Sequence, residues 1–113
     1  MSTSRRGFAF ASYIVDPVRR LVWQDRRLLP IEGKPFEILV FLVEHRDRIV
    51  EKDELLKSVW PDTFVQENNL VRHISTLRKA LGQRPDDHTC IVTVKGRGYQ
   101  FVAEVRELDS LPA

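Results

Sequence analysis

Residues 65–82 carry side chains whose types and spacing could read DNA. The apolar residues recur at intervals of four, three and four, which places them on one face of a helix; they are Leu70, Ile74, Leu77 and Leu81. The opposite face holds amides, hydroxyls and cations, namely Asn68, Arg72, Ser75, Thr76 and Lys79. Arginine pairs with guanine, asparagine with adenine and lysine with phosphate, so such a face is suited to the DNA major groove. The alternative is an ordinary basic surface helix, since solvated charged faces are common.

The distribution of charge is more informative than its total. The 113 residues, most simply one domain, carry 18 Lys and Arg against 16 Asp and Glu, a formal net charge of +2. This balance is too mild to indicate a nucleic-acid partner by itself. However, the segment from Asn68 to Gly82 contains no acidic residue, whereas acids concentrate between Glu32 and Glu67 and again from Glu104 to Asp109. Two stretches are therefore basic: the first 27 residues, with six arginines against Asp16 and Asp25, and the segment that could read DNA.

Motifs for catalysis, metal binding or membrane insertion are missing from the sequence. Cys90 is the only cysteine, so neither an intrachain disulfide nor a cysteine metal cluster is expected. The three histidines fall on separate predicted elements and no phosphate-binding loop is present, so we expect no enzyme, cofactor or metal. The longest unbroken aliphatic and aromatic run, Ile38 to Val43, is too short to cross a bilayer. We expect a cytoplasmic protein, with a membrane tether in a longer parent protein left open.

The segments before residue 82 have the patterns of strands and then helices. Residues 8–31 indicate short strands of an antiparallel meander, which needs helices on one face to be stable. Pro35 is suited to the first turn of a helix, and a second helix is predicted from Glu51 to Trp60. The third helix, Gln66 to Leu81, is the one that could read DNA.

The ends of the third helix have recognisable signals. Thr63 and Gln66 have the spacing of a capping box, with Thr63 as the candidate N-cap, although a start one or two residues later is equally tenable. Gly82 supplies the left-handed position that commonly ends a helix.

A β-hairpin is predicted after the third helix. Two β-rich runs, Cys90–Val94 and Tyr99–Val105, are joined by Lys95-Gly96-Arg97-Gly98. A hairpin with cations at its tip can lie along a phosphate backbone or reach into the minor groove, although tips are often polar simply because they are solvated. We expect a folded domain over residues 8–105, a disordered N-terminus at 1–7 and a linker or tail at 106–113.

The order of these elements is that of a helix-turn-helix followed by a wing. Four pieces of the chain resemble the winged-helix effector domain of OmpR/PhoB-type bacterial transcription regulators. They are Pro35-Phe36-Glu37-Ile38-Leu39, Leu55-Leu56-Lys57-Ser58-Val59-Trp60, His73-Ile74-Ser75-Thr76-Leu77-Arg78-Lys79-Ala80-Leu81, and Val92-Thr93-Val94-Lys95-Gly96-Arg97-Gly98-Tyr99-Gln100-Phe101. The resemblance implies an α+β fold with an N-terminal four-stranded antiparallel sheet, three helices and a C-terminal hairpin wing.

The resemblance also implies how double-stranded DNA would be bound. Helix 66–81 would enter the major groove, with the wing, residues 90–103, on the backbone and minor groove. Residues at or near base edges would be Asn68, Asn69, Arg72, His73 and Thr76. Residues on the backbone or in the wing would be Trp60, through its indole N–H, Ser75, Arg78, Lys79, Thr93, Lys95 and Arg97. Trp60 could equally serve only to close the core.

The sequence departs from the family pattern in two ways. Many members have arginines where Ser75 and Thr76 stand, so we expect a different operator, with Arg72 supplying a cation one turn earlier. Only about seven residues precede the first predicted strand, so we expect no N-terminal receiver domain and a layout closer to sensor-fused relatives.

Several partners follow from the resemblance alone. They are a second copy of the chain on tandem half-sites, RNA polymerase at loop 61–65, and a sensor or membrane domain in a longer parent protein. A winged helix that binds protein instead of DNA is the rival function. Salt dependence distinguishes the two, because binding to phosphates weakens steeply with salt.

Overall fold

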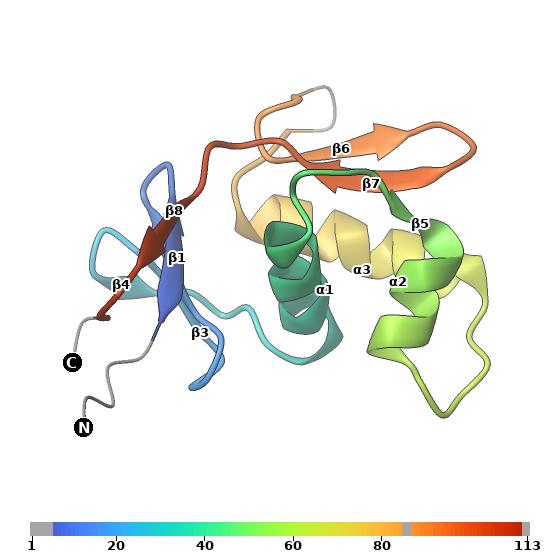
Figure 1. Cartoon of the computed structure of the whole chain (residues 1–113), viewed down its shortest axis with the longest axis horizontal. Coiled ribbons are helices and arrows are strands. Elements are labelled where there is room, and N and C mark those ends of the chain that lie inside the picture. Colours follow the sequence, from blue (N-terminus) through green and yellow to red (C-terminus); the bar gives the residue numbers. More distant parts are fainter. Residues whose placement is uncertain (1–5, 85–86, 112–113) are drawn as a thin grey trace.

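The computed structural model describes residues 6–84 and 87–111 of the chain. Three helices lie between a five-stranded sheet on one side and a three-stranded sheet that includes the hairpin on the other (Figure 1). This arrangement confirms the predicted α+β winged-helix fold. No helix within the described ranges is long and apolar enough to cross a bilayer.

The N-terminal sheet is an antiparallel meander. Its first four strands are β1 (Gly7–Phe10), β2 (Tyr13–Asp16), β3 (Leu21–Gln24) and β4 (Arg27–Leu28). The side chains of alternate residues along a strand point to the same face of the sheet, because a strand is pleated. Phe10, Tyr13, Val15 and Val22 are buried against the helices as a result. The apolar side of this sheet thus closes one side of the core.

A fifth strand joins this sheet from the C-terminal end of the chain. The sequence analysis assigns residues 106–113 to a linker or tail, whereas β8 (Arg106–Leu108) pairs antiparallel with β1. The same pairing places Gly7 in β1 and not in a disordered terminus. Arg106 and Glu107 are exposed on an edge strand, where charged residues are common, so their polarity concealed the strand. The expectations for residues 1–5 and 112–113 lie outside the described residues.

The helices begin and end close to their predicted positions. They are α1 (Gly33–Glu44), α2 (Lys52–Val59) and α3 (Glu67–Ala80). Pro35 lies in the first turn of α1, where its missing N–H removes no helical hydrogen bond. The N-cap of α3 is Gln66, whose side chain makes no capping hydrogen bond. The capping box with Thr63 as N-cap is therefore wrong, and the later start is the one observed.

The wing consists of β6 (Ile91–Val94) and β7 (Gly98–Phe101). A two-residue strand before α2, β5 (Val50–Glu51), pairs with β7 and completes a three-stranded sheet. The second wing strand ends at Phe101, earlier than the predicted Val105, because the chain then crosses to the N-terminal sheet (Figure 1).

The core surrounds α1, which lies between the two sheets (Figure 1). Its largest fully buried side chains come from every layer: Phe10, Phe36, Phe101, Ile38, Leu39, Leu42, Leu55, Leu70, Ile74, Leu77, Ile91 and Val15. The Tyr13 hydroxyl donates a hydrogen bond to the carbonyl of Leu81, which joins the N-terminal sheet to the end of α3. One continuous core therefore holds α3 against the rest of the domain.

Candidate nucleic-acid interface

One side of α3 is buried and the other is exposed. The predicted apolar stripe is confirmed, since Leu70, Ile74, Leu77 and Leu81 are all buried. The exposed side chains beyond the first residue of the helix are Asn68, Val71, Arg72, Ser75, Thr76 and Lys79. Among the described residues, no element buries these six side chains. We call this set the α3 face.

The α3 face is free of carboxylates. The one acidic residue of the helix, Glu67, lies in its first turn, where a negative charge stabilises the helix dipole. Its carboxylate lies 3.2 Å from the Lys52 ammonium. Within the described part of the chain, Arg72 and Lys79 take part in no ion pair. Both cations are therefore free to meet an anionic partner.

Asn69 and His73 lie at one edge of the α3 face and are half-buried. The His73 ring packs against the Trp60 indole, with ring centroids 5.6 Å apart. The Lys34 ammonium lies 5.7 Å from the Trp60 ring and donates a hydrogen bond to the Val59 carbonyl at 2.8 Å. Trp60 thus packs against the core while half-exposed at the end of α2. This position suits both of the roles considered for Trp60.

Arg78, which the sequence analysis assigns to the DNA backbone, lies at the other edge and is half-buried. Its Nη2 donates hydrogen bonds to the Ile91 carbonyl at 3.1 Å and to Thr93 Oγ1 at 2.8 Å. Burial lowers the pKa of the Arg78 guanidinium. Nε is buried and has no hydrogen-bond partner among the described residues. Arg78 is therefore a bridge between α3 and the wing, which helical spacing alone could not reveal.

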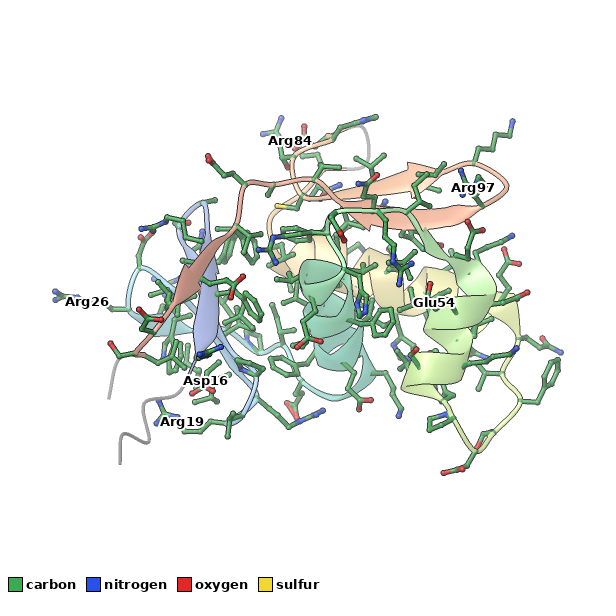
Figure 2. The ribbon with its side chains drawn as sticks, viewed as in Figure 1. Asp16, Arg19, Arg26, Glu54, Arg84 and Arg97 are labelled. Atoms are coloured by element: carbon green, nitrogen blue, oxygen red, sulfur yellow. The ribbon has the colours of Figure 1, made fainter. Side chains whose placement is uncertain are left out.

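Three polar residues of the wing are exposed: Thr93, Lys95 and Arg97. Thr93 accepts the hydrogen bond from Arg78, which fixes β6 relative to α3. Arg97 lies at the tip of the wing, where Figure 2 labels it, and its guanidinium pairs with Glu51 at 2.7 Å. Lys95 forms no ion pair within the described ranges. Unlike Arg97, it can meet an anionic partner without first leaving a carboxylate.

A groove of about 310 Å³ separates α3 from the wing. Its walls include Val71 and Ser75 from the helix and Thr93 and Lys95 from the wing. Val71 is 49% exposed, and the sequence analysis did not select it because it is apolar. Its place on a helical wheel, next to Asn68 and Ser75, would have identified it.

The loop between α2 and α3 exposes a large aromatic residue. Phe64 is 90% exposed and lines a shallow pocket with Leu56 and Trp60. The loop lies at the end of α2 opposite β5, away from the wing (Figure 1).

Comparisons with known proteins point in the same direction. The model of the family described as transcriptional regulatory protein, C terminal, matches residues 25–101. The chain is 38% identical over 80 residues to the transcriptional regulatory protein YvcP of Bacillus subtilis, which covers 70% of this chain and 33% of YvcP. It is 35% identical over 98 residues to the transcriptional regulator HilA of Salmonella typhi, covering 87% of this chain and 17% of HilA. The chain thus spans a third or less of the length of these relatives.

Solved structures with the same fold include two DNA-binding domains. The RstA DNA-binding domain of Klebsiella pneumoniae, in complex with the RstA box, has a TM-score of 0.76 at 30% identity, covering 85% of this chain and 96% of that chain. The DNA-binding domain of CadC from Escherichia coli has a TM-score of 0.78 at 28% identity, covering 92% of this chain and 98% of that chain.

Proposed function

The chain belongs to the family of transcriptional regulatory protein C-terminal domains, and from this membership we propose that it binds double-stranded DNA sequence-specifically in a bacterial transcription regulator. The observation that carries the proposal is the α3 face. It offers an amide, two hydroxyls and two cations that form no ion pair with any described residue, and it contains no carboxylate. The similarity to the RstA domain, whose structure includes its DNA box, supports the same conclusion.

In this proposal α3 enters the major groove. Arg72, central on the α3 face, pairs with guanine, while Asn68 is placed to pair with adenine. Thr76, one turn after Arg72, contacts bases through its hydroxyl or methyl group. Asn69 and His73 lie at the edge of the face and contact the outer base pairs or the adjoining backbone.

The backbone contacts in this proposal come from both sides of α3. Lys79 and Ser75 meet phosphates beside the groove, and the Trp60 indole N–H reaches the backbone from the end of α2. Thr93 and Lys95 meet phosphates from the wing, and Arg97 reaches the minor groove once it leaves Glu51. Arg78 supports these contacts by holding the wing against α3.

Selection of bound sites from random duplexes, followed by titrations at several salt concentrations, tests this function. Each neutralised phosphate should contribute about −0.9 to the slope of log affinity against log salt. Binding that is strong but insensitive to salt, or the absence of any enriched site, would contradict the proposal. A direct or an inverted repeat in the selected sites would show how two copies are arranged.

Two variants of the α3 face distinguish base recognition from electrostatic attraction to phosphates. Arg72→Ala should weaken binding to the selected site by about 1–3 kcal/mol and have little effect on random DNA. Lys79→Ala should weaken binding to all sequences alike and reduce the salt slope by about one. If Arg72→Ala leaves both affinity and preference unchanged, the reading face has been assigned wrongly.

Three further partners belong to this proposal. The loop 61–65 offers the exposed Phe64 to RNA polymerase. A second copy of the chain binds a tandem half-site, about 10 base pairs away. In a longer parent protein, a sensor or membrane domain supplies the signal, while the DNA-binding part acts in the cytoplasm where bacterial DNA lies.

A further inference from the structure

Val71 is an apolar residue on a face that is otherwise polar. Its side chain is 49% exposed and lies between Glu67, one turn earlier, and Ser75, one turn later. A β-branched residue is a weak helix former, so Val71 does not improve α3 as a helix. It also adds little to the core, because the buried positions around it are held by Leu70 and Ile74. The domain itself therefore gives no reason for a valine at this position.

Val71 lies at the rim of the α3 face that is nearer the wing. It lines the groove between α3 and the wing, together with Ser75 and Lys95. The neighbouring carboxylate of Glu67 is paired with Lys52, so it does not repel a phosphate as a free charge would. Val71 also follows Asn68 by one turn, on the side of the α3 face that is nearer the wing.

The major groove offers one apolar group to such a side chain. Among the four base pairs, only those with thymine present a methyl group there, at C5. Apart from the C5–H of cytosine, which has no methyl group, the other groups on base edges are mainly hydrogen-bond donors and acceptors, which a valine cannot satisfy. A valine over a thymine removes apolar surface from water on both partners, which is favourable.

We propose that Val71 is a specificity-determining residue that selects a thymine through contact with its C5 methyl group. The inference rests on the proposed function, since it requires α3 to lie in the major groove. It assigns one position of the operator to an apolar contact, next to the position read by Asn68 or Arg72. The contact involves no hydrogen bond. A base that lacks the C5 methyl group at this position therefore binds less tightly.

Deoxyuridine substitution tests this contact directly, because it removes only the methyl group. The full chain is titrated with its selected duplex and with duplexes in which each thymine in turn is replaced by deoxyuridine. One replacement should weaken binding about fourfold, the effect of one buried methyl-sized group. Val71→Ala should bind the thymine duplex about fourfold more weakly than the unmodified chain, and bind thymine and deoxyuridine duplexes equally.

Ser75→Ala is the matched control, because it shortens the next side chain along the same groove. Loss of its phosphate contact should weaken binding to both duplexes alike and leave the fourfold preference for thymine over deoxyuridine unchanged. Alanine is the better helix former at both positions. Neither substitution should therefore lower the melting temperature, and loss of folding would not explain the difference.

The outcomes separate this inference from the function on which it rests. If the unmodified chain binds its selected duplex but shows no thymine preference at any position, the inference is overturned and DNA binding stands. The same holds if Val71→Ala retains the full preference. If no duplex is bound at all, the proposed function fails and the inference fails with it.

Discussion

The guanidinium of Arg97 at the wing tip is held by Glu51, with Nη2 2.7 Å and Nε 3.2 Å from the same carboxylate oxygen. Both side chains are about half exposed, at 57% and 48%. An exposed pair of this kind adds little to stability and opens easily. Arg97 must therefore exchange Glu51 for a phosphate if it is to bind DNA, and the carboxylate left behind lies close to the same backbone.

Glu51→Gln should strengthen DNA binding for this reason. The substitution releases Arg97 and removes a negative charge beside the wing. We expect tighter binding to specific and random duplexes alike, and a salt slope steeper by up to about one, as for one added phosphate contact. Dissociation constants measured at several salt concentrations provide the check.

Glu54→Gln is the control for the change in net charge. Glu54 pairs with Arg48 at 2.6 Å and lies on α2, away from the wing tip (Figure 2). It should alter affinity less than Glu51→Gln does. Equal effects of the two variants would mean that Glu51 acts only through total charge and does not restrain Arg97.

Arg78 should contribute to stability more than to phosphate binding. Arg78→Ala removes hydrogen bonds to the Ile91 carbonyl and Thr93, both of which join α3 to the wing. We expect a loss of about 1–3 kcal/mol in the free energy of unfolding, measured by urea denaturation. The adjacent, exposed Lys79→Ala should change it by less than about 0.5 kcal/mol. An Arg78→Ala variant as stable as Lys79→Ala would show that the bridge is unimportant.

Features that depend on local periodicity could be predicted from the sequence. The apolar stripe of α3 repeats with the helical period, so its buried side and its exposed polar side follow from spacing alone. The meander and the wing are likewise visible as short β-rich runs separated by turn residues. The family resemblance added the arrangement of these elements in space.

Features that depend on contacts between distant segments could not be predicted. Glu51 and Arg97 are 46 residues apart, and nothing local to either indicates the pair. The position of Arg78 along α3 is one that an exposed cation could also occupy. Only the packing of the wing against α3 shows that its acceptors are the Ile91 carbonyl and Thr93. The strand at Arg106–Leu108 has too few apolar residues to be recognised until β1 offers its edge. In each case the missing information is tertiary.

Asp16 should make the free energy of unfolding of the domain depend on pH in the acidic range. Its side chain is fully buried, and burial alone would raise the pKa of its carboxyl group. Hydrogen bonds from the Arg19 side chain and from the backbone N–H groups of Arg19 and Val18 together outweigh burial and lower that pKa below its usual 3.8. Figure 2 places Asp16 and Arg19 at the end of the N-terminal sheet.

The direction of the pH effect follows from this lowered pKa. Well above pH 3.8 Asp16 is ionised in both the folded and the unfolded state, and its stabilising contribution is complete. As the pH falls through the lower pKa of the folded state, the unfolded chain binds the proton more readily and the contribution is lost. Asp16→Asn should reduce stability at neutral pH and flatten its fall in acid, as measured by urea denaturation across that range. An unchanged acid profile would exclude Asp16 as its source.

Gly98 should be essential because β5 and β7 approach each other too closely for any side chain. A Cβ built there would lie 2.0 Å from the Val50 carbonyl oxygen and 3.0 Å from the Cα of Glu51. Both are backbone atoms of the paired strand, so neither can turn aside. Gly98→Ala should therefore force β5 away from the wing and cost about 3 kcal/mol of unfolding free energy.

Gly96 provides the matched control: it lies two residues earlier, in the turn of the wing, and a different constraint favours glycine there. Its φ of +75° favours glycine, yet no atom lies within 4 Å of an added Cβ. Gly96→Ala should cost only about 1 kcal/mol, the strain of a left-handed backbone. Calorimetric melting of the two variants separates steric exclusion from backbone strain. Equal losses of unfolding free energy in the two variants would mean that β5 can move away from β7 without disturbing the wing. Such movement would also weaken the ion pair between Glu51 and Arg97.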